Sequence, residues 1–291
     1  MRMSFGIVRP VKRKAAQKRL QPGDHSAKVL AVAAQKGGVG KTTTAVSLAS
    51  AWVRNHGLKV LVVDLDPQAN VSISLRAQVS AAGGPITEVL DEPKVAEVAE
   101  CAAETSIDGL YVTPMDPGLQ RFEDRMSSRI GKELLLRQAL QVSRTHYDLI
   151  ILDCPPHIGG LTVNALVAAD QVLVPTSLAA LSVAGVGGLV EAVDEVQGEL
   201  NPGLEVAGVL LTQVDGRSAR VNQTVLDMVG DAWDDMLLDT HIGVDNTLAR
   251  AQLAGEDIYT FAPGCRAAGW YAQLAADLGE KLGLGLESDR S

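Results

Sequence analysis

The sequence is poor in aromatic residues, in cysteine and in long apolar runs. Phe, Trp and Tyr make up only 3% of its 291 residues, and its three cysteines (Cys101, Cys154 and Cys265) form no Cys-x-x-Cys pair. The five histidines are not spaced as metal ligands, so a zinc, haem or iron–sulfur centre built by one chain is not expected. No stretch approaches about 18 uncharged apolar residues, and the first residues lack the features of a secretory signal. We therefore expect no integral membrane segment and a cytoplasmic location.

Charge is distributed unevenly along the chain. The whole sequence carries a net charge of −9, yet residues 1–23 contain seven basic residues and no acidic one. The rest of the chain therefore holds 19 basic and 35 acidic residues, a net charge of −16. Because 46% of the residues are hydrophobic, this acidic part has enough apolar side chains for a buried core. We expect a basic, disordered tail over residues 1–26 and a single folded domain over residues 27–291.

Short apolar runs alternate with longer amphipathic stretches after residue 28. Such runs are typical of strands that are buried on both faces of a sheet. The expected strands are residues 29–34, 60–63, 110–113, 149–152, 171–175 and 206–212. The expected helices include residues 41–54, 132–143, 183–200 and 266–282. This alternation predicts an α/β fold: a mostly parallel twisted sheet with helices on both faces.

A glycine-rich loop joins the first expected strand to the first expected helix. It reads Gln35-Lys36-Gly37-Gly38-Val39-Gly40-Lys41-Thr42 and ends in the Gly-Lys-Thr pattern of a phosphate-binding loop. Glycines let the backbone turn its N–H groups toward a bound anion, and the helix N-terminus adds partial positive charge. Lys41 would bridge the outer phosphates of a triphosphate, and the Thr42 hydroxyl would bind Mg²⁺. The loop therefore predicts a site for a magnesium nucleotide.

Carboxylates follow two of the expected strands. Asp64 and Asp66 come after residues 60–63, and Asp153 comes after residues 149–152. Ligands of open α/β sheets bind at the carboxyl ends of the strands. Any one of these acids alone could be a solvated or helix-capping residue, but three of them beside a phosphate loop indicate metal and water chemistry.

Three segments resemble the nucleotide-binding motifs of one family. KGGVGKTT (36–43), VDLDPQAN (63–70) and YDLIILDCPP (147–156) are similar to the deviant Walker A, Walker A′ and Walker B segments of ParA-family partitioning ATPases, in the ParA/MinD superfamily. The resemblance covers nearly all of residues 27–291. It implies a P-loop NTPase fold of the deviant Walker A type, ATP and Mg²⁺ as cofactors, and slow, partner-stimulated hydrolysis of ATP to ADP and phosphate.

The same resemblance implies a role for each motif residue. Lys36 would reach the phosphates held by a second copy in an ATP-sandwich homodimer, where it would act as an arginine finger does. Asp66 would orient the attacking water, while Asp64 and Asp153 would hold the hydration shell of Mg²⁺. The catalytic set is then Lys36, Lys41 and Asp66, and the metal set is Thr42, Asp64 and Asp153. The nucleotide-binding set is Lys36, Gly37, Gly38, Val39, Gly40, Lys41, Thr42 and Thr43, with Thr212 and Asp215 near the adenine. Thr212 and Asp215 could equally cap the junction between a strand and a loop.

The resemblance further implies that the ATP-bound dimer binds nonspecific double-stranded DNA, associates with the nucleoid and is reset by a ParB-like or cargo adaptor protein. Many relatives carry basic residues in a segment like I-P-R-N-V-R-L, and residues 242–248 of this chain lack them. Candidate replacements are Arg217, Arg220, Arg250 and Arg266, each of which could also be an ordinary surface residue. The basic tail is either a solubilising arm or an arm that binds DNA or a partner.

The predicted function is segregation or positioning of a DNA or protein cargo by a ParA-type ATPase. The sequence leaves open whether that cargo is a chromosome, a plasmid or a protein cluster. Two alternatives use the same nucleotide site: a MinD-like ATPase that acts at a membrane, and a nucleotide-dependent scaffold with little hydrolysis. The C-terminal segment is acidic and broken by glycines, which makes it a poor lipid anchor. Lys36 and Asp66 favour hydrolysis over a scaffold.

Overall fold

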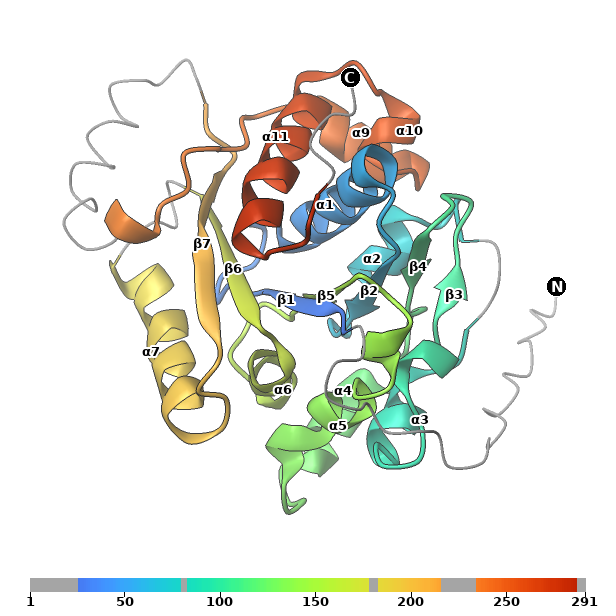
Figure 1. Cartoon of the computed structure of the whole chain (residues 1–291), viewed down its shortest axis with the longest axis vertical. Coiled ribbons are helices and arrows are strands. Elements are labelled where there is room, and N and C mark those ends of the chain that lie inside the picture. Colours follow the sequence, from blue (N-terminus) through green and yellow to red (C-terminus); the bar gives the residue numbers. More distant parts are fainter. Residues whose placement is uncertain (1–25, 80–82, 178–182, 216–233, 287–291) are drawn as a thin grey trace, which may run out of the picture.

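The computed structural model describes residues 26–79, 83–177, 183–215 and 234–286. Within these residues one sheet of seven strands has the order β3-β4-β2-β5-β1-β6-β7 (Figure 1). The strands are β1 Lys28–Val32, β2 Val60–Asp64, β3 Ala103–Glu104, β4 Leu110–Val112, β5 Leu149–Asp153, β6 Gln171–Ser177 and β7 Glu205–Thr212. All neighbours pair in parallel except β3 and β4, which pair antiparallel at one edge. The predicted α/β fold with a mostly parallel sheet is confirmed.

Helices cover both faces of the sheet, as Figure 1 shows. One face carries α1 Lys41–His56, α2 Asn70–Ser74, α9 Asn246–Ala254, α10 Ile258–Phe261 and α11 Arg266–Lys281. The other carries α3 Ile86–Asp91, α4 Leu119–Met126, α5 Leu135–Ala139, α6 Gly160–Ala168 and α7 Val183–Glu199. Short 3₁₀ turns lie at Val98–Glu100, Lys132–Leu134, Ser143–Thr145 and Asp234–Met236. Successive strand residues point to opposite faces, so Val29 and Ala31 join one core layer while Leu30 and Val32 join the other.

Helix α1 is fixed against α11 by buried aromatic residues. Trp52 and Tyr271 are almost fully buried. The indole Nε1 of Trp52 donates to the carbonyl of Ala275 at 2.9 Å, and the hydroxyls of Thr44 and Tyr271 share a hydrogen bond at 3.2 Å. Burying large aromatic side chains with their polar ends satisfied stabilises such a contact strongly. The first turn of α1, which follows the glycine-rich loop, is therefore held in place by the C-terminal helix.

Most expected elements are present, but the helix expected over residues 132–143 is wrong. That stretch is a 3₁₀ turn, the short helix α5 and a second 3₁₀ turn. Asn164 of α6 explains part of the break, because its amide accepts from the N–H of Leu136 at 3.1 Å and donates to the carbonyl of Lys132 at 2.7 Å. Backbone groups that a continuous helix would pair internally are bound by a distant side chain instead.

The described residues contain no helix that is both long and apolar enough to cross a membrane. Residues 1–25 lie outside the described residues, so the expected basic tail stays a prediction. The same holds for the expected single domain over residues 27–291.

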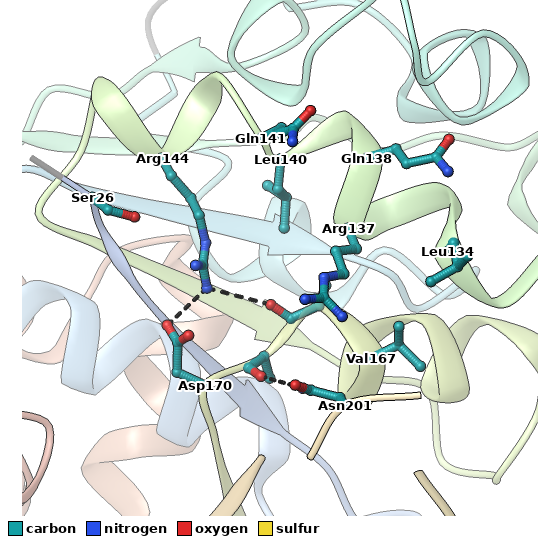
Figure 2. A pocket seen from close by; sticks show the side chains of 12 residues that line it. Ser26, Leu134, Arg137, Gln138, Leu140, Gln141, Arg144, Val167, Asp170 and Asn201 are labelled. Carbon is teal, nitrogen blue, oxygen red and sulfur yellow. Dashed lines mark hydrogen bonds and ion pairs between the residues drawn. The ribbon is translucent and has the colours of Figure 1, made fainter. Parts of the chain in front are cut away.

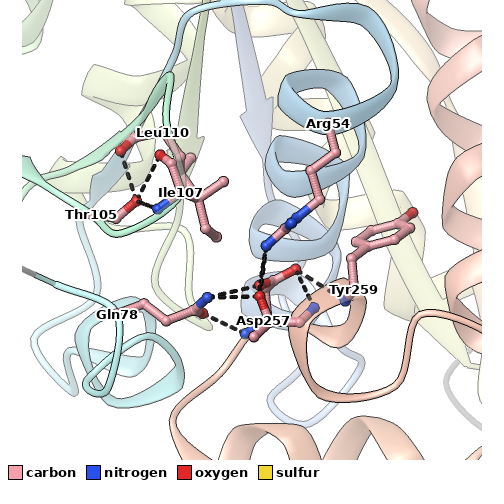
Figure 3. A network of polar contacts seen from close by, with 8 residues as sticks. Arg54, Gln78, Thr105, Ile107, Leu110, Asp257 and Tyr259 are labelled. Carbon is pink, nitrogen blue, oxygen red and sulfur yellow. Dashed lines mark hydrogen bonds and ion pairs between the residues drawn. The ribbon is translucent and has the colours of Figure 1, made fainter.

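A buried carboxylate ties the end of α1 to the segment before α10 (Figure 3). Asp257 is 1% exposed. Its side chain accepts from Arg54 at 3.0 Å and from the Gln78 amide at 2.9 Å. It also accepts from the first N–H groups of α10, those of Tyr259 and Thr260. All of its partners are donors, so the charge of Asp257 is fully compensated.

Replacing Asp257 with alanine is expected to lower the free energy of unfolding by about 3 kcal/mol, because the Arg54 guanidinium, the Gln78 amide and the N-terminus of α10 lose their shared buried acceptor. Guanidinium chloride unfolding measures the change. Asp257→Asn, which keeps an acceptor oxygen, should lose less. An alanine variant that unfolds at the wild-type denaturant concentration would show that this network contributes nothing.

Candidate functional site

The glycine-rich loop connects β1 to α1 at the carboxyl edge of the sheet. Gly38 and Gly40 adopt left-handed backbone conformations with φ of 75° and 85°, which only glycine adopts without strain. Gly40 is also the N-cap of α1 and supplies no capping side chain. The N–H groups of the first turn of this 16-residue helix therefore point out of the helix without a side-chain acceptor. Such a terminus binds anions such as phosphate.

Lys41 is a buried cation at the start of α1. It is 7% exposed, and its Nζ donates to the carbonyl of Lys36 at 3.3 Å. Burial lowers the pKa of Lys41, while the nearby charges of Asp153 and Asp66 oppose that shift. Among the described residues it forms no direct ion pair. An ammonium held in this way has hydrogen-bonding capacity left for an anionic ligand.

Asp153 is the fully buried acid of the site. Its Oδ2 accepts from the Thr42 hydroxyl at 2.6 Å. Its Oδ1 is buried and has no hydrogen-bond partner in the part of the chain that the structure describes. Burial, and then the charge of Asp64, raises the pKa of Asp153 well above its usual range. An unpartnered buried carboxylate oxygen is unfavourable without a cation or water beside it.

Asp64 is the last residue of β2, and Asp66 lies in the loop between β2 and α2. Asp64 pairs with Asp153 across the sheet, and its two oxygens accept from the N–H groups of Asp66 and Val71, each at 3.1 Å. Burial raises the pKa of Asp64 to about 7. Asp66 is 5% exposed, and its Oδ1 accepts from the N–H of Gln68 at 2.9 Å. Asp64 therefore also shapes the loop that presents Asp66.

The charges at this edge suit a divalent cation. Three buried carboxylates and one buried ammonium lie at this edge, and one carboxylate oxygen has no hydrogen-bond partner among the described residues. Within the described ranges no three His, Cys, Asp or Glu side chains form a ligand set of their own. This combination fits Mg²⁺, which keeps several waters and takes few protein ligands beside substrate phosphates. Thr42 and Asp153 are the residues in position to hold such a hydrated ion, and the metal role of Asp64 stays a prediction.

Lys36 differs from Lys41 in its surroundings. It lies in the exposed part of the loop together with Gln35, Gly37 and Gly38. Only its main-chain carbonyl takes part in a hydrogen bond between described residues, as the acceptor for Lys41. Its ammonium therefore has no partner among the residues that the structure describes.

Residues at the end of β7 form hydrogen bonds with the glycine-rich loop. The Thr212 hydroxyl lies 2.8 Å from the carbonyl of Val39 and 3.1 Å from that of Thr176, and it can donate to either. The next residue, Gln213, donates to the carbonyl of Gly38 at 2.7 Å. Gln213 was not selected from the sequence, because a contact between residues 175 positions apart leaves no local signal. Its left-handed backbone, with φ of 56°, is rarely predictable for a residue other than glycine.

A cavity of about 220 Å³ adjoins the loop. Gly40, Thr43 and Thr212 line one side of it, and Leu248 and Tyr271 line the other. Thr43 and Thr212, both predicted to contact nucleotide, therefore lie beside one hollow. Asp215 is described and half-buried after the end of β7, but it is not among the residues that line this cavity; its role stays a prediction.

Two of the four candidate DNA-binding arginines are described. Arg250 on α9 and Arg266 at the start of α11 are exposed, and each lies over an aromatic ring at 5.5 Å, Phe261 for Arg250 and Trp270 for Arg266. Such stacking holds a guanidinium in place without removing its charge. Arg217 and Arg220 lie outside the described residues.

A larger cavity of about 400 Å³ lies at the opposite edge of the sheet (Figure 2). Its charged groups already have partners: Arg144 donates to Asp170 at 2.8 Å, and Arg137 donates to the carbonyl of Leu200 at 3.2 Å. Asn201 donates to the carbonyls of Leu166 and Ala169. These bonds connect neighbouring elements, and the chemistry of the predicted site is at the other edge.

Comparison with known proteins finds relatives over most of the chain. A protein-family model described as an AAA domain matches residues 27–206. The sporulation initiation inhibitor protein Soj of Bacillus subtilis is 35% identical over 86% of this chain and 98% of its own length. The chromosome partitioning protein ParA of Caulobacter vibrioides is 35% identical over 86% of this chain and 93% of its own. The crystal structure of cobyrinic acid a,c-diamide synthase from Mycobacterium smegmatis with bound ADP and magnesium is 31% identical, with a TM-score of 0.73, over 91% of this chain and 100% of that one.

Proposed function

Because the chain belongs to the ParA/Soj family of P-loop ATPases, we propose that it is a switch in which bound MgATP joins two copies into a dimer that binds DNA. The protein is an ATPase of this family. Hydrolysis, slow in the free protein and stimulated by a ParB-like or cargo adaptor protein, returns it to the monomer. Cycling between these states on the nucleoid segregates or positions a DNA or protein cargo.

Different residues at the carboxyl edge of the sheet bind different parts of MgATP. The N–H groups after Gly38 and Gly40 and the ammonium of Lys41 bind the phosphates. Thr42 and Asp153 hold the hydrated ion, which when bound neutralises charge on the phosphates. Asp66, buried beside them, accepts a proton or hydrogen bond from the attacking water. The cavity lined by Thr43 and Thr212 takes the adenine and ribose.

The observation that carries the dimer proposal is the contrast between the two lysines of the loop. Lys41 is buried and directed into its own site, whereas Lys36 is exposed and tied to the loop by its carbonyl alone. A lysine four residues after β1 that does not serve its own phosphates can serve those of a second copy. Charge supplied in trans is a known way to accelerate phosphoryl transfer.

DNA binding is proposed for the surface around α9 and the start of α11. Arg250 and Arg266 lie there, stacked over aromatic rings. The acidic character of the molecule outside the tail means that any DNA contact has to come from such a local basic patch. Arg217, Arg220 and the basic tail are further candidates for the same role.

Replacing Arg250 and Arg266 with alanine tests this surface. Each substitution is expected to weaken ATP-dependent DNA binding equally for all sequences and to reduce the slope of log K against log salt by about 1. Electrophoretic mobility shifts across a salt series measure both quantities. Arg137→Ala, an exposed arginine at the opposite edge, is the matched control. If neither substitution changes the slope while wild-type protein binds DNA, the contact lies elsewhere.

A further inference from the structure

The loop after Asp153 lies against the glycine-rich loop. It runs from Cys154 to Gly159 and leads into α6. A Cβ placed on Gly37 would lie 3.9 Å from the Cβ of Pro156, an ordinary van der Waals distance. The position of this loop therefore affects both the Asp153 carboxylate at one end and the backbone beside Lys36 at the other.

One carboxylate fixes the far end of this loop. Glu123 of α4 is 12% exposed at its side chain. Its Oε1 accepts from the N–H of Leu161 in the first turn of α6 at 3.1 Å, and its Oε2 lies 3.3 Å from Nε2 of His157. The carbonyl of His157 in turn accepts from the Thr162 hydroxyl at 2.7 Å. A carboxylate at a helix N-terminus is well placed for such a bond.

The surroundings leave this carboxylate little freedom. A Cβ on Gly159 would collide with both the Glu123 carboxylate and the His157 ring, so the loop passes tightly between them. Glu123 itself is held by its own helix, since Phe122 and Met126 are 1% and 3% exposed in the core. Of the two residues linked here, His157 is the more exposed, with half of its side chain accessible to solvent.

We propose that Glu123 is a positioning residue for ATP hydrolysis. Through His157 and the first turn of α6 it holds residues 154–159 against the glycine-rich loop. This contact keeps Asp153 and the backbone at Lys36 and Gly37 in fixed positions relative to each other. The proposal rests on the nucleotide site proposed above. Glu123 touches neither nucleotide nor metal, and it acts only through the loop.

Steady-state hydrolysis by the full chain, with and without DNA, tests this role. Glu123→Ala is expected to lower kcat about ten-fold and to change KM less than about two-fold. A misplaced loop slows the chemical step more than it weakens the binding of ATP. Glu123→Gln keeps an acceptor for Leu161 and should recover most of the loss. Asp124→Ala, which removes an exposed carboxylate from the same helix, should leave kcat unchanged.

A double-mutant cycle with His157→Ala separates positioning from general structural damage. His157→Ala alone should lower kcat about three-fold, and it should add little in the Glu123→Ala background because both changes break one link. An unchanged kcat in Glu123→Ala, or independent multiplication of the two effects, would overturn the proposal. If Glu123→Ala does not fold, the cycle is run with Glu123→Gln. In that case, a kcat of His157→Ala equal to that of the wild type overturns the proposal. Dimerisation of the wild type is measured separately, so a failure of the dimer proposal can be distinguished from a failure of the role proposed for Glu123.

Discussion

Replacing Lys36 with alanine is expected to abolish ATP-dependent dimerisation and to lower kcat by a factor of about 10³, the lower range for a cation supplied in trans to phosphoryl transfer. Lys36 is exposed, and among described residues only its carbonyl is hydrogen bonded. Removing the side chain therefore leaves the carbonyl that accepts from Lys41 in place. Nucleotide binding by the monomer should persist.

Light scattering with MgATP, together with phosphate release, measures both effects. Lys94→Ala, which removes an exposed lysine near α3, is the control and should dimerise normally. Binding of a fluorescent ATP analogue by Lys36→Ala confirms that the site itself is intact. Normal ATP-induced dimers in Lys36→Ala would defeat the role assigned to this residue.

Replacing Asp153 with asparagine is expected to have opposite effects on the two forms of the protein. Without nucleotide, the wild-type site holds three buried carboxylates against one ammonium, so removing one negative charge should stabilise the fold by about 1 kcal/mol or more. With MgATP, the variant should lose nearly all ligand stabilisation, which for a wild-type protein at 100 times its Kd is about 2.7 kcal/mol. Thr42 can still donate to the asparagine oxygen, so the local hydrogen bond survives.

Thermal unfolding at several pH values checks this prediction. The pKa of Asp153 is raised in the folded state from the usual 3.8, so its charge lowers wild-type stability as the pH rises above that usual value. The advantage of Asp153→Asn without nucleotide should therefore be largest at neutral pH and shrink toward pH 4. Asp194→Asn, at an exposed position on α7, should show no such trend. If Asp153→Asn is less stable than the wild type at neutral pH and is still stabilised by MgATP, both parts of the prediction are contradicted.

The parts of this structure that the sequence predicted are those with a local cause. Uninterrupted apolar runs predicted six of the strands, and the glycines of residues 37–40 predicted the turn into α1. The convergence of Asp64 and Asp153 also followed, because parallel strands end at one edge. Each of these inferences needs only a local sequence pattern and the general geometry of a parallel sheet.

The parts that were missed depend on contacts between distant residues. The stretch 132–143 has helical periodicity, but Asn164 binds its backbone groups. The antiparallel strand β3 is two residues long, too short for a periodic signal. Gln213 and Glu123 act on loops 175 and 38 residues away in sequence. No composition or spacing rule connects such pairs before the fold is known.

Light scattering of the wild-type protein with magnesium and a slowly hydrolysed ATP analogue, compared with magnesium and ADP, tests the central claim most directly. The account predicts a mass twice that of the 30.6 kDa chain with the ATP analogue and a mass of one chain with ADP. A mass of one chain in both conditions, with thermal stabilisation proving that nucleotide is bound, would contradict it.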